Sequence, residues 1–145
     1  MSMQSWSEEG FGYELYNTEN CGKIAEFLKK HVDKETCKNY EKLQAYEVNN
    51  PDDFEYEMYQ ILGETAEICI GEIINKETGY CGFRGYIACG DTEVYPHIGY
   101  PPGYQWYRKP DMFLTEEKVR EILEKYAEEL GITEKPDYFI LEYYG

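Results

Sequence analysis

The fold class depends on one 22-residue stretch, Ile68–Cys89, which has the sequence ICIGEIINKETGYCGFRGYIAC. Its first half fits two structures. Apolar residues recur at the helical period, but Gly63 and Gly71 weaken a helix and the isoleucines favour a strand. Asn75–Gly79 then has the composition of a hairpin turn, and the residues after it alternate between apolar and polar. We therefore predict a β-hairpin with strands Ile68–Ile74 and Tyr80–Cys89.

Upstream of this hairpin the sequence predicts one strand and three helices. They are, in order, strand Phe11–Tyr16, a helix from a cap at Thr18 or Asn20 to Val32, a helix over Lys34–Glu47 and a helix that starts at Asn50. The last start has a side chain that can cap, then a proline at the first helical position. Asp52 and Asp53 follow it, where acid meets the positive end of the helix dipole.

Downstream of the hairpin we expect a strand over Thr92–Ile98, then a helix over Glu116–Leu130 and a closing strand over Tyr138–Tyr143. Thr115 caps this helix and Gly131 ends it. Its apolar residues recur on one face and are Val119, Ile122, Leu123, Tyr126, Ala127 and Leu130. The pattern predicts an α+β fold, with N-terminal helices packed on a mainly antiparallel sheet and a C-terminal helix and closing strand.

Length and composition predict a single domain over residues 1–145. A chain of this size buries roughly 68–70% of its unfolded surface, which is enough for a hydrophobic core. The first ten residues contain two glutamates and no apolar run, and no 18-residue apolar segment exists anywhere. The five cysteines form no Cys-x-x-Cys pair, so we expect reduced thiols and a cytoplasmic protein.

Acid is concentrated in a second informative stretch, Leu43–Asn75, which holds eight carboxylates and no lysine or arginine in a chain of net charge −15. A field of this sign repels nucleic acid and anionic membranes and attracts basic protein surfaces. Tyr56 and Tyr59 lie among the acids. We expect a partner protein with a basic surface, such as a nuclease, and no direct contact with nucleic acid or membrane.

A second aromatic group occupies Tyr95–Tyr107, which has four tyrosines and one tryptophan between prolines and glycines. Such a loop can be ordered while it presents large rings, and Tyr and Trp are frequent binding anchors. The alternative is that the rings cover the open face of the sheet. If the loop binds, Tyr100, Tyr104 and Trp106 belong to the site, and a small molecule or glycan is an alternative ligand.

One enzyme hypothesis competes with these binding hypotheses. Cys21 is expected at a helix N-terminus, where the dipole lowers the pKa of a thiol. His97 could then serve as its base, as in cysteine-dependent acyl transfer. No local motif supports this pair, so we expect a binding protein more than an enzyme.

Metal sites and cofactors are not expected. Asp53, Glu55, Glu57 and Glu64 match calcium-loop positions, but Met58 stands where the loop requires glycine. Cys81, Cys89 and His97 lack the close spacing of small zinc sites, and the two cysteines alternate with the apolar face as core residues would.

The function that this sequence favours is that of an acidic protein-binding module. Carboxylates on neighbouring helical turns can replace phosphates, and tyrosine rings can replace bases, so the protein would act as an inhibitor that mimics nucleic acid. In size and charge it is similar to nuclease inhibitors of phages and mobile elements, including anti-CRISPR and anti-restriction proteins. The expected partner-binding residues are Glu47, Asp52, Asp53, Glu55, Tyr56, Glu57, Tyr59, Tyr100, Tyr104 and Trp106.

Overall fold

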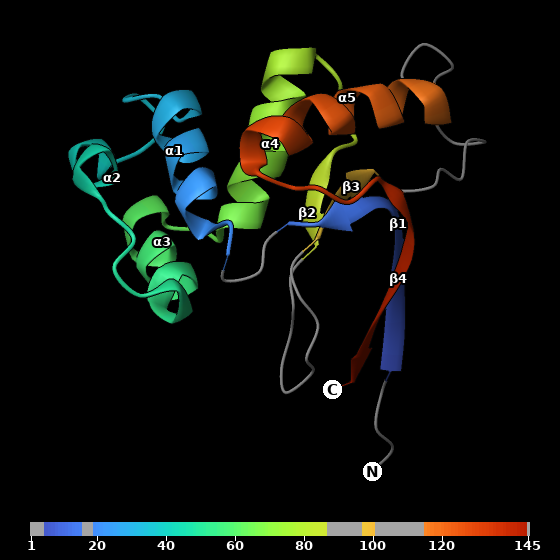
Figure 1. Ribbon diagram of the computed structural model, residues 1–145, viewed down its shortest axis with the longest axis horizontal. Coiled ribbons are helices and arrows are strands. Elements are labelled where there is room, and N and C mark those ends of the chain that lie inside the picture. The colour runs from blue at the N-terminus through green and yellow to red at the C-terminus, as the bar shows by residue number, and fades with distance from the viewer. Residues whose placement is uncertain (1–4, 16–18, 87–96, 101–114, 145) are drawn as a thin grey trace.

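A computed structural model describes residues 5–15, 19–86, 97–100 and 115–144 (Figure 1). The strands are β1 (Ser5–Glu14), β2 (Arg84–Tyr86), β3 (His97–Tyr100) and β4 (Asp137–Tyr144). The helices are α1 (Cys21–His31), α2 (Tyr40–Ala45), a short 3-10 turn η1 (Pro51–Asp53), α3 (Phe54–Leu62), α4 (Ala66–Thr78) and α5 (Glu116–Leu130).

The described strands form one sheet in the order β2-β3-β1-β4, and every neighbouring pair is antiparallel. Figure 1 shows α4 between the sheet and the group formed by α1, α2 and α3, with α5 crossing above. The predicted α+β class with an antiparallel sheet is therefore confirmed. The helix that packs directly on β2 and β3 is α4.

The predicted strand Ile68–Ile74 is wrong, because these residues lie inside α4. The helical period decides the conformation: the buried side chains on its apolar face are Ala66, Cys69, Ile70, Ile73 and Ile74. The predicted turn is the end of this helix, where Gly79 has φ of 82° and donates its N–H to the carbonyl of Asn75. Of the predicted strand Tyr80–Cys89, Arg84–Tyr86 forms β2 and pairs with β3, while 87–89 lie outside the described residues.

Two glycines allow α4 to cross β2 at close range. A Cβ atom on Gly71 would lie 2.9 Å from the Cα of Arg84. A Cβ atom on Gly85 would lie 2.8 Å from the Cβ of Glu67 and would also collide with the backbone carbonyl of that residue. Gly71, which in the sequence counted against a helix, is thus a contact point between helix and strand.

The C-terminal helix matches its prediction in both caps and in its buried face. The hydroxyl of Thr115 accepts a hydrogen bond from the N–H of Lys118 at 3.2 Å, and Gly131 ends the helix with φ of 74°. All six residues of the predicted inward face are buried. The hydroxyl of Tyr13 donates to the carbonyl of Leu123 at 2.9 Å, which ties α5 to β1.

The remaining elements confirm some boundaries and correct others. The first helix is confirmed as α1, but Asn20 does not cap it and donates its side-chain N–H to the carbonyl of Leu15 instead. The second helix is shorter than Lys34–Glu47, because a turn closed by Asp33 and Thr36 precedes it. The strands expected near both ends of the chain are confirmed as β1 and β4.

Two strand boundaries extend into residues that the structure does not describe. The strand expected over Thr92–Ile98 coincides with β3 only at His97 and Ile98, and residues 92–96 lie outside the described part of the chain. Residue 16, the predicted end of the first strand, lies outside it as well.

The close crossing predicts that Gly85→Ala destabilises the protein. The added methyl group has no space beside Glu67, and overpacking of this kind typically costs about 1–3 kcal/mol. Urea unfolding followed by circular dichroism measures the loss. Gly22→Ala on α1 is the matched control, since nothing lies within 4 Å of the added atom and alanine favours the helix. Equal stability of the two variants would contradict the close crossing.

Candidate protein-binding surface

The orientation of α3 follows from its first turn and its apolar side chains. The side-chain oxygen of Asn50 accepts a hydrogen bond from the N–H of Asp52 at 3.2 Å, as its predicted capping role requires. Pro51 takes the first position of η1, which leads directly into α3. Phe54 and Met58 are fully buried, so the opposite side of the helix faces solvent.

Four exposed residues follow one another on that solvent side at the helical spacing of three and four. We call Asp52, Glu55, Tyr56 and Tyr59 the α3 outer stripe. The side chains of Tyr56 and Tyr59 are 69% and 52% exposed, which is high for rings of this size. The stripe therefore presents two carboxylates beside two accessible aromatic rings, along η1 and the helix α3 that follows it directly.

The carboxylates around this stripe have no basic neighbour in ion-pair contact within the described part of the chain. This group consists of Glu47, Asp52, Asp53, Glu55 and Glu57. Other surface acids are paired, for example Asp33 with Lys76 at 2.8 Å. Because α3 contains no basic residue, its negative field extends into solvent without internal compensation.

The other predicted partner-binding residues have different environments. Glu47 is exposed and lies between α2 and η1, while Glu57 is half-buried. Burial, together with the nearby carboxylate of Glu57, raises the pKa of Tyr46 to about 12. Tyr100 is the last residue of β3, but its side chain is not described, and residues 104 and 106 lie outside the described part. The role of the Tyr95–Tyr107 loop stays a prediction.

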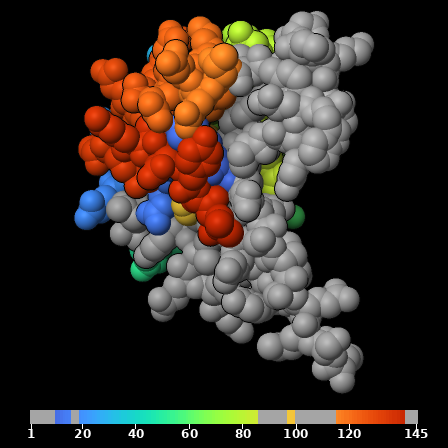
Figure 2. Space-filling model, turned by 90° about the vertical axis from the view of Figure 1, so that its right-hand side faces the viewer, coloured from blue at the N-terminus to red at the C-terminus, as the bar shows by residue number. Residues whose placement is uncertain are grey.

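A second pair of exposed large side chains, Tyr138 and Ile140, lies on β4. Figure 2 shows α5 and the segment from its end into β4 on one continuous face of the molecule. Tyr138 already has partners there: its ring meets Phe11 edge to face at 5.0 Å, and a hydrogen bond with Glu116 raises the pKa of its hydroxyl. Within the described residues the α3 outer stripe has no comparable partners, so it is the better candidate for an external one.

The environment of Cys21 does not favour the activated thiol that a cysteine-dependent enzyme would need. The side chain is only 1% exposed, and burial raises the pKa of the thiol, with Glu55 and Asp52 adding to the shift. The expected lowering of this pKa is wrong, because burial and two carboxylates outweigh the helix N-terminus. His97 lies in β3 next to the buried Ile98, so strand alternation turns it to the opposite face of the sheet, where its ring stacks on Phe139 at 4.4 Å.

The structure also corrects the environment of the cysteines. Cys81 is exposed, because the hairpin that would have turned it inward does not form. Cys37 and Cys69 are buried, and Cys89 lies outside the described residues. Within the described residues, no three His, Cys, Asp or Glu side chains are grouped so that they could hold a metal ion.

Sequence reasoning missed Glu67, which is completely buried at the first turn of α4. Among the described residues, none forms a hydrogen bond to either of its carboxyl oxygens. Burial raises the pKa of Glu67 to about 7, and the carboxylate of Glu55 adds to the shift. Its own backbone N–H and the hydroxyl of Thr65 act in the opposite direction without reaching hydrogen-bond geometry.

Sequence reasoning also missed a polar cluster that joins three helices. His31 of α1 contacts Glu77 of α4 at 2.5 Å through Nδ1 and Glu129 of α5 at 2.8 Å through Nε2. Tyr126 donates its hydroxyl proton to the other carboxyl oxygen of Glu77 at 2.6 Å, and Lys30 pairs with Glu129. His31 therefore has a carboxylate at each of its ring nitrogens. The cluster holds α1, α4 and α5 together.

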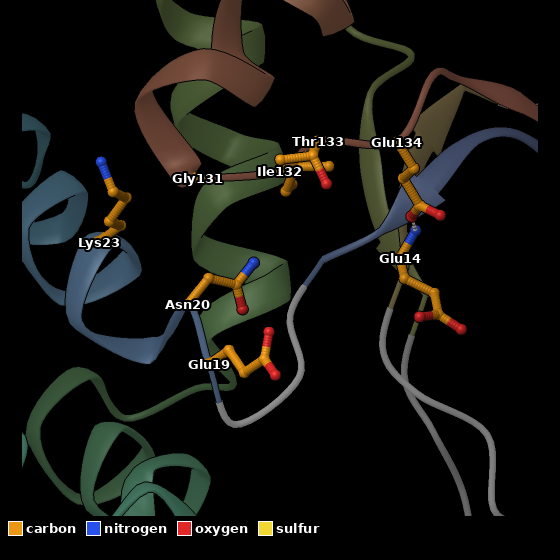
Figure 3. Close-up of a pocket in the computed structure, with 8 residues that line it drawn as sticks. All are labelled: Glu14, Glu19, Asn20, Lys23, Gly131, Ile132, Thr133 and Glu134. Carbon is orange, nitrogen blue, oxygen red and sulfur yellow. Dashed lines mark hydrogen bonds between the residues drawn. The ribbon is translucent and has the colours of Figure 1, made fainter.

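A hollow beside these elements lies between the start of α1 and the end of α5 (Figure 3). It has a volume of about 390 Å³, and its lining residues are Glu14, Glu19, Asn20, Lys23 and Gly131–Glu134. Glu134 accepts a hydrogen bond from the backbone N–H of Glu14 at 2.6 Å, and the aliphatic stem of Lys23 packs against Gly131. These side chains contact one another or nearby backbone at the ends of two helices.

Comparisons with known proteins returned no relative: no family model, curated protein or solved structure matches this chain. In the described residues, none of the helices is both long and apolar enough to cross a membrane.

The environment of Glu67 predicts a pH dependence of stability. Because its folded-state pKa of about 7 exceeds its ordinary value of 4.5, folded protein binds the proton more tightly than unfolded chain. The stabilisation is therefore complete below pH 4.5 and is lost as the pH rises through 7. The raised pKa corresponds to about 3 kcal/mol at most.

Glu67→Gln should remove this dependence, since the amide keeps the shape without titrating. Urea unfolding of both proteins at pH 5 and pH 8 measures the change in stability with pH. Other groups contribute equally to both proteins, so subtracting one change from the other isolates Glu67. Glu64 is one such group, because burial and Glu72 raise its pKa as well. If both proteins lose the same stability between these pH values, Glu67 is not the titrating group.

The thiol environments predict selective labelling of the native protein. N-ethylmaleimide should modify Cys81 quickly, while Cys21, Cys37 and Cys69 should react only after unfolding, because they are buried. Peptide mass spectrometry assigns each site, and Cys81→Ser is the control. Fast native labelling of Cys21 would contradict its buried environment and revive the enzyme hypothesis.

Proposed function

We propose that this protein is an acidic, cytoplasmic protein-binding module that docks its α3 outer stripe on a basic groove of a nucleic-acid-binding protein. The observation that supports this proposal is the combination, on one face, of two highly exposed tyrosines with carboxylates that form no ion pair among the described residues. The carboxylates stand in for phosphates and the rings for bases. A nuclease of the kind that anti-CRISPR or anti-restriction proteins inhibit is a partner of this chemistry.

The charge argument favours a basic protein partner over other ligands. Exposed carboxylates that form no ion pair among the described residues can bind lysine or arginine side chains without first breaking such a pair. Tyr56 and Tyr59 add apolar area and can stack on guanidinium groups, which carboxylates alone cannot provide. The proposed docking needs no reactive group at this surface.

Charge reversal tests the proposal directly. Replacing Asp52, Asp53 and Glu55 with lysine should weaken capture of the partner from host lysate, and duplex DNA or RNA should elute the partner from wild-type protein. The matched control replaces Glu117, Glu124 and Glu128 of α5, which are equally exposed and give the same change in net charge. Circular dichroism confirms that each variant folds.

The two variants separate a specific surface from a general charge effect. The proposal expects the α3 variant to lose at least tenfold in affinity and the α5 variant to lose much less, with affinity falling steeply as salt rises. Equal losses in both would indicate attraction to net charge alone. A partner that DNA and RNA fail to displace would contradict mimicry.

The exposed rings give an independent test. Tyr56→Ala and Tyr59→Ala should each reduce affinity for the captured partner by about 1–2 kcal/mol, the size of a moderate interface residue, with almost no change in melting temperature. Binding is measured by calorimetry on the purified complex. Unchanged affinity in both variants would leave the tyrosines without a role in docking.

A further inference from the structure

The buried carboxyl of Glu67 belongs to α4, the helix that packs against α3. Glu67 is the second residue of α4. A Cβ atom added to Gly85 would lie 2.8 Å from the Cβ atom of Glu67, so β2 covers Glu67 on one side. The side chain is 0% exposed, and both carboxyl oxygens lack a hydrogen-bond partner among the described residues. An ionised carboxylate in such a place is costly, so burial favours the neutral acid in the free protein.

The charged groups on the elements around Glu67 do not offset its negative charge. α3 contributes Glu55, which is exposed and disfavours ionisation. β2 contributes Gly85 at the contact, and the neighbouring Arg84 is exposed. β3 contributes the apolar Ile98 on the helix side, with His97 on the opposite face. Thr65, the residue directly before α4, is the adjacent polar group along the chain.

Glu55 therefore connects the surface to the interior, since it belongs to the α3 outer stripe and also acts on Glu67. A cation placed against Glu55 cancels its repulsion of Glu67 and adds an attraction to the ionised form. Thermodynamic linkage makes the effect reciprocal, so ionisation of Glu67 must strengthen binding of that cation by the same factor.

We propose that docking of a basic partner on the α3 outer stripe is coupled to release of the proton that Glu67 carries in the free protein. The inference rests on the proposed function and names its regulation. Affinity for the partner then rises with pH across the range in which Glu67 ionises. Each unit by which the partner lowers the Glu67 pKa gives a tenfold difference in affinity between the high-pH and low-pH limits.

An octalysine peptide is a suitable probe, because lysine does not titrate between pH 5.8 and 8.2 and surface carboxylates of ordinary pKa stay ionised there. Calorimetry at low, constant ionic strength in phosphate and in Tris gives the affinity and the number of protons released. The proteins compared are wild type, Glu67→Gln, Glu55→Gln and Glu128→Gln. The last is the matched control, because it removes one exposed carboxylate far along the chain, on α5.

The coupling predicts that wild type and Glu128→Gln release a measurable fraction of a proton near pH 7 and bind about three- to tenfold more tightly at pH 8.2 than at pH 5.8. Glu67→Gln should lack that component, and Glu55→Gln should show less of it. If Glu67→Gln releases as many protons as wild type, the coupling is wrong while the binding proposal stands. If octalysine binds neither protein, both proposals are wrong.

A measurement on wild type alone avoids dependence on the folding of any variant. The carboxyl carbon resonance of Glu67, followed by nuclear magnetic resonance, reports its titration midpoint in the free protein and in the presence of saturating octalysine. The coupling predicts a lower midpoint in the complex. An unchanged midpoint would overturn it.

Discussion

The structure depends on the close crossing of α4 over β2. Gly71 on the helix and Gly85 on the strand leave no space between the two backbones, so the first turn of α4 is pressed against the sheet. This contact sets the position of α4, and Figure 1 shows the three smaller helices grouped on its far side. The same contact encloses Glu67, a carboxyl whose neutral form is favoured because water cannot reach it.

Acidic residues occur in three different environments in the described part of this chain. The carboxylates on α3 have no ion-pair partner among the described residues, whereas Glu77 and Glu129 both contact His31 where α1, α4 and α5 meet. A high count of acidic residues therefore has three different physical meanings here: a surface field, an internal ion-pair cluster and one neutral buried acid. The proposed binding function concerns only the first of these.

Local signals in the sequence were sufficient for some elements and misleading for one. The caps at Thr115 and Gly131 and the spacing between them predict α5, because each signal acts within one turn of the helix. The hairpin prediction failed at Gly71, since a glycine that permits contact with a distant strand looks the same in sequence as one that breaks a helix. The composition of Asn75–Gly79 suits a helix end as well as a hairpin turn.

Some residues of the candidate site could be predicted from local sequence signals, and others could not. The start of α3 at Asn50 and the exposed side of that helix follow from cap chemistry and from the apolar residues Phe54 and Met58. Glu67 could not be distinguished from its seven acidic neighbours in Leu43–Asn75, because burial is a property of the packed structure. The partners of His31 lie 46 and 98 residues away in the chain, a separation that no local pattern reveals.

The central claim is that the α3 outer stripe is where this protein meets a basic surface. Titration of isotopically labelled protein with octalysine, followed by amide chemical shifts, locates the contact residue by residue. We expect the largest shifts between residues 47 and 60, with smaller shifts at the first turn of α4. Shifts centred on α5 or on the hollow between α1 and α5, with α3 unchanged, would contradict the claim.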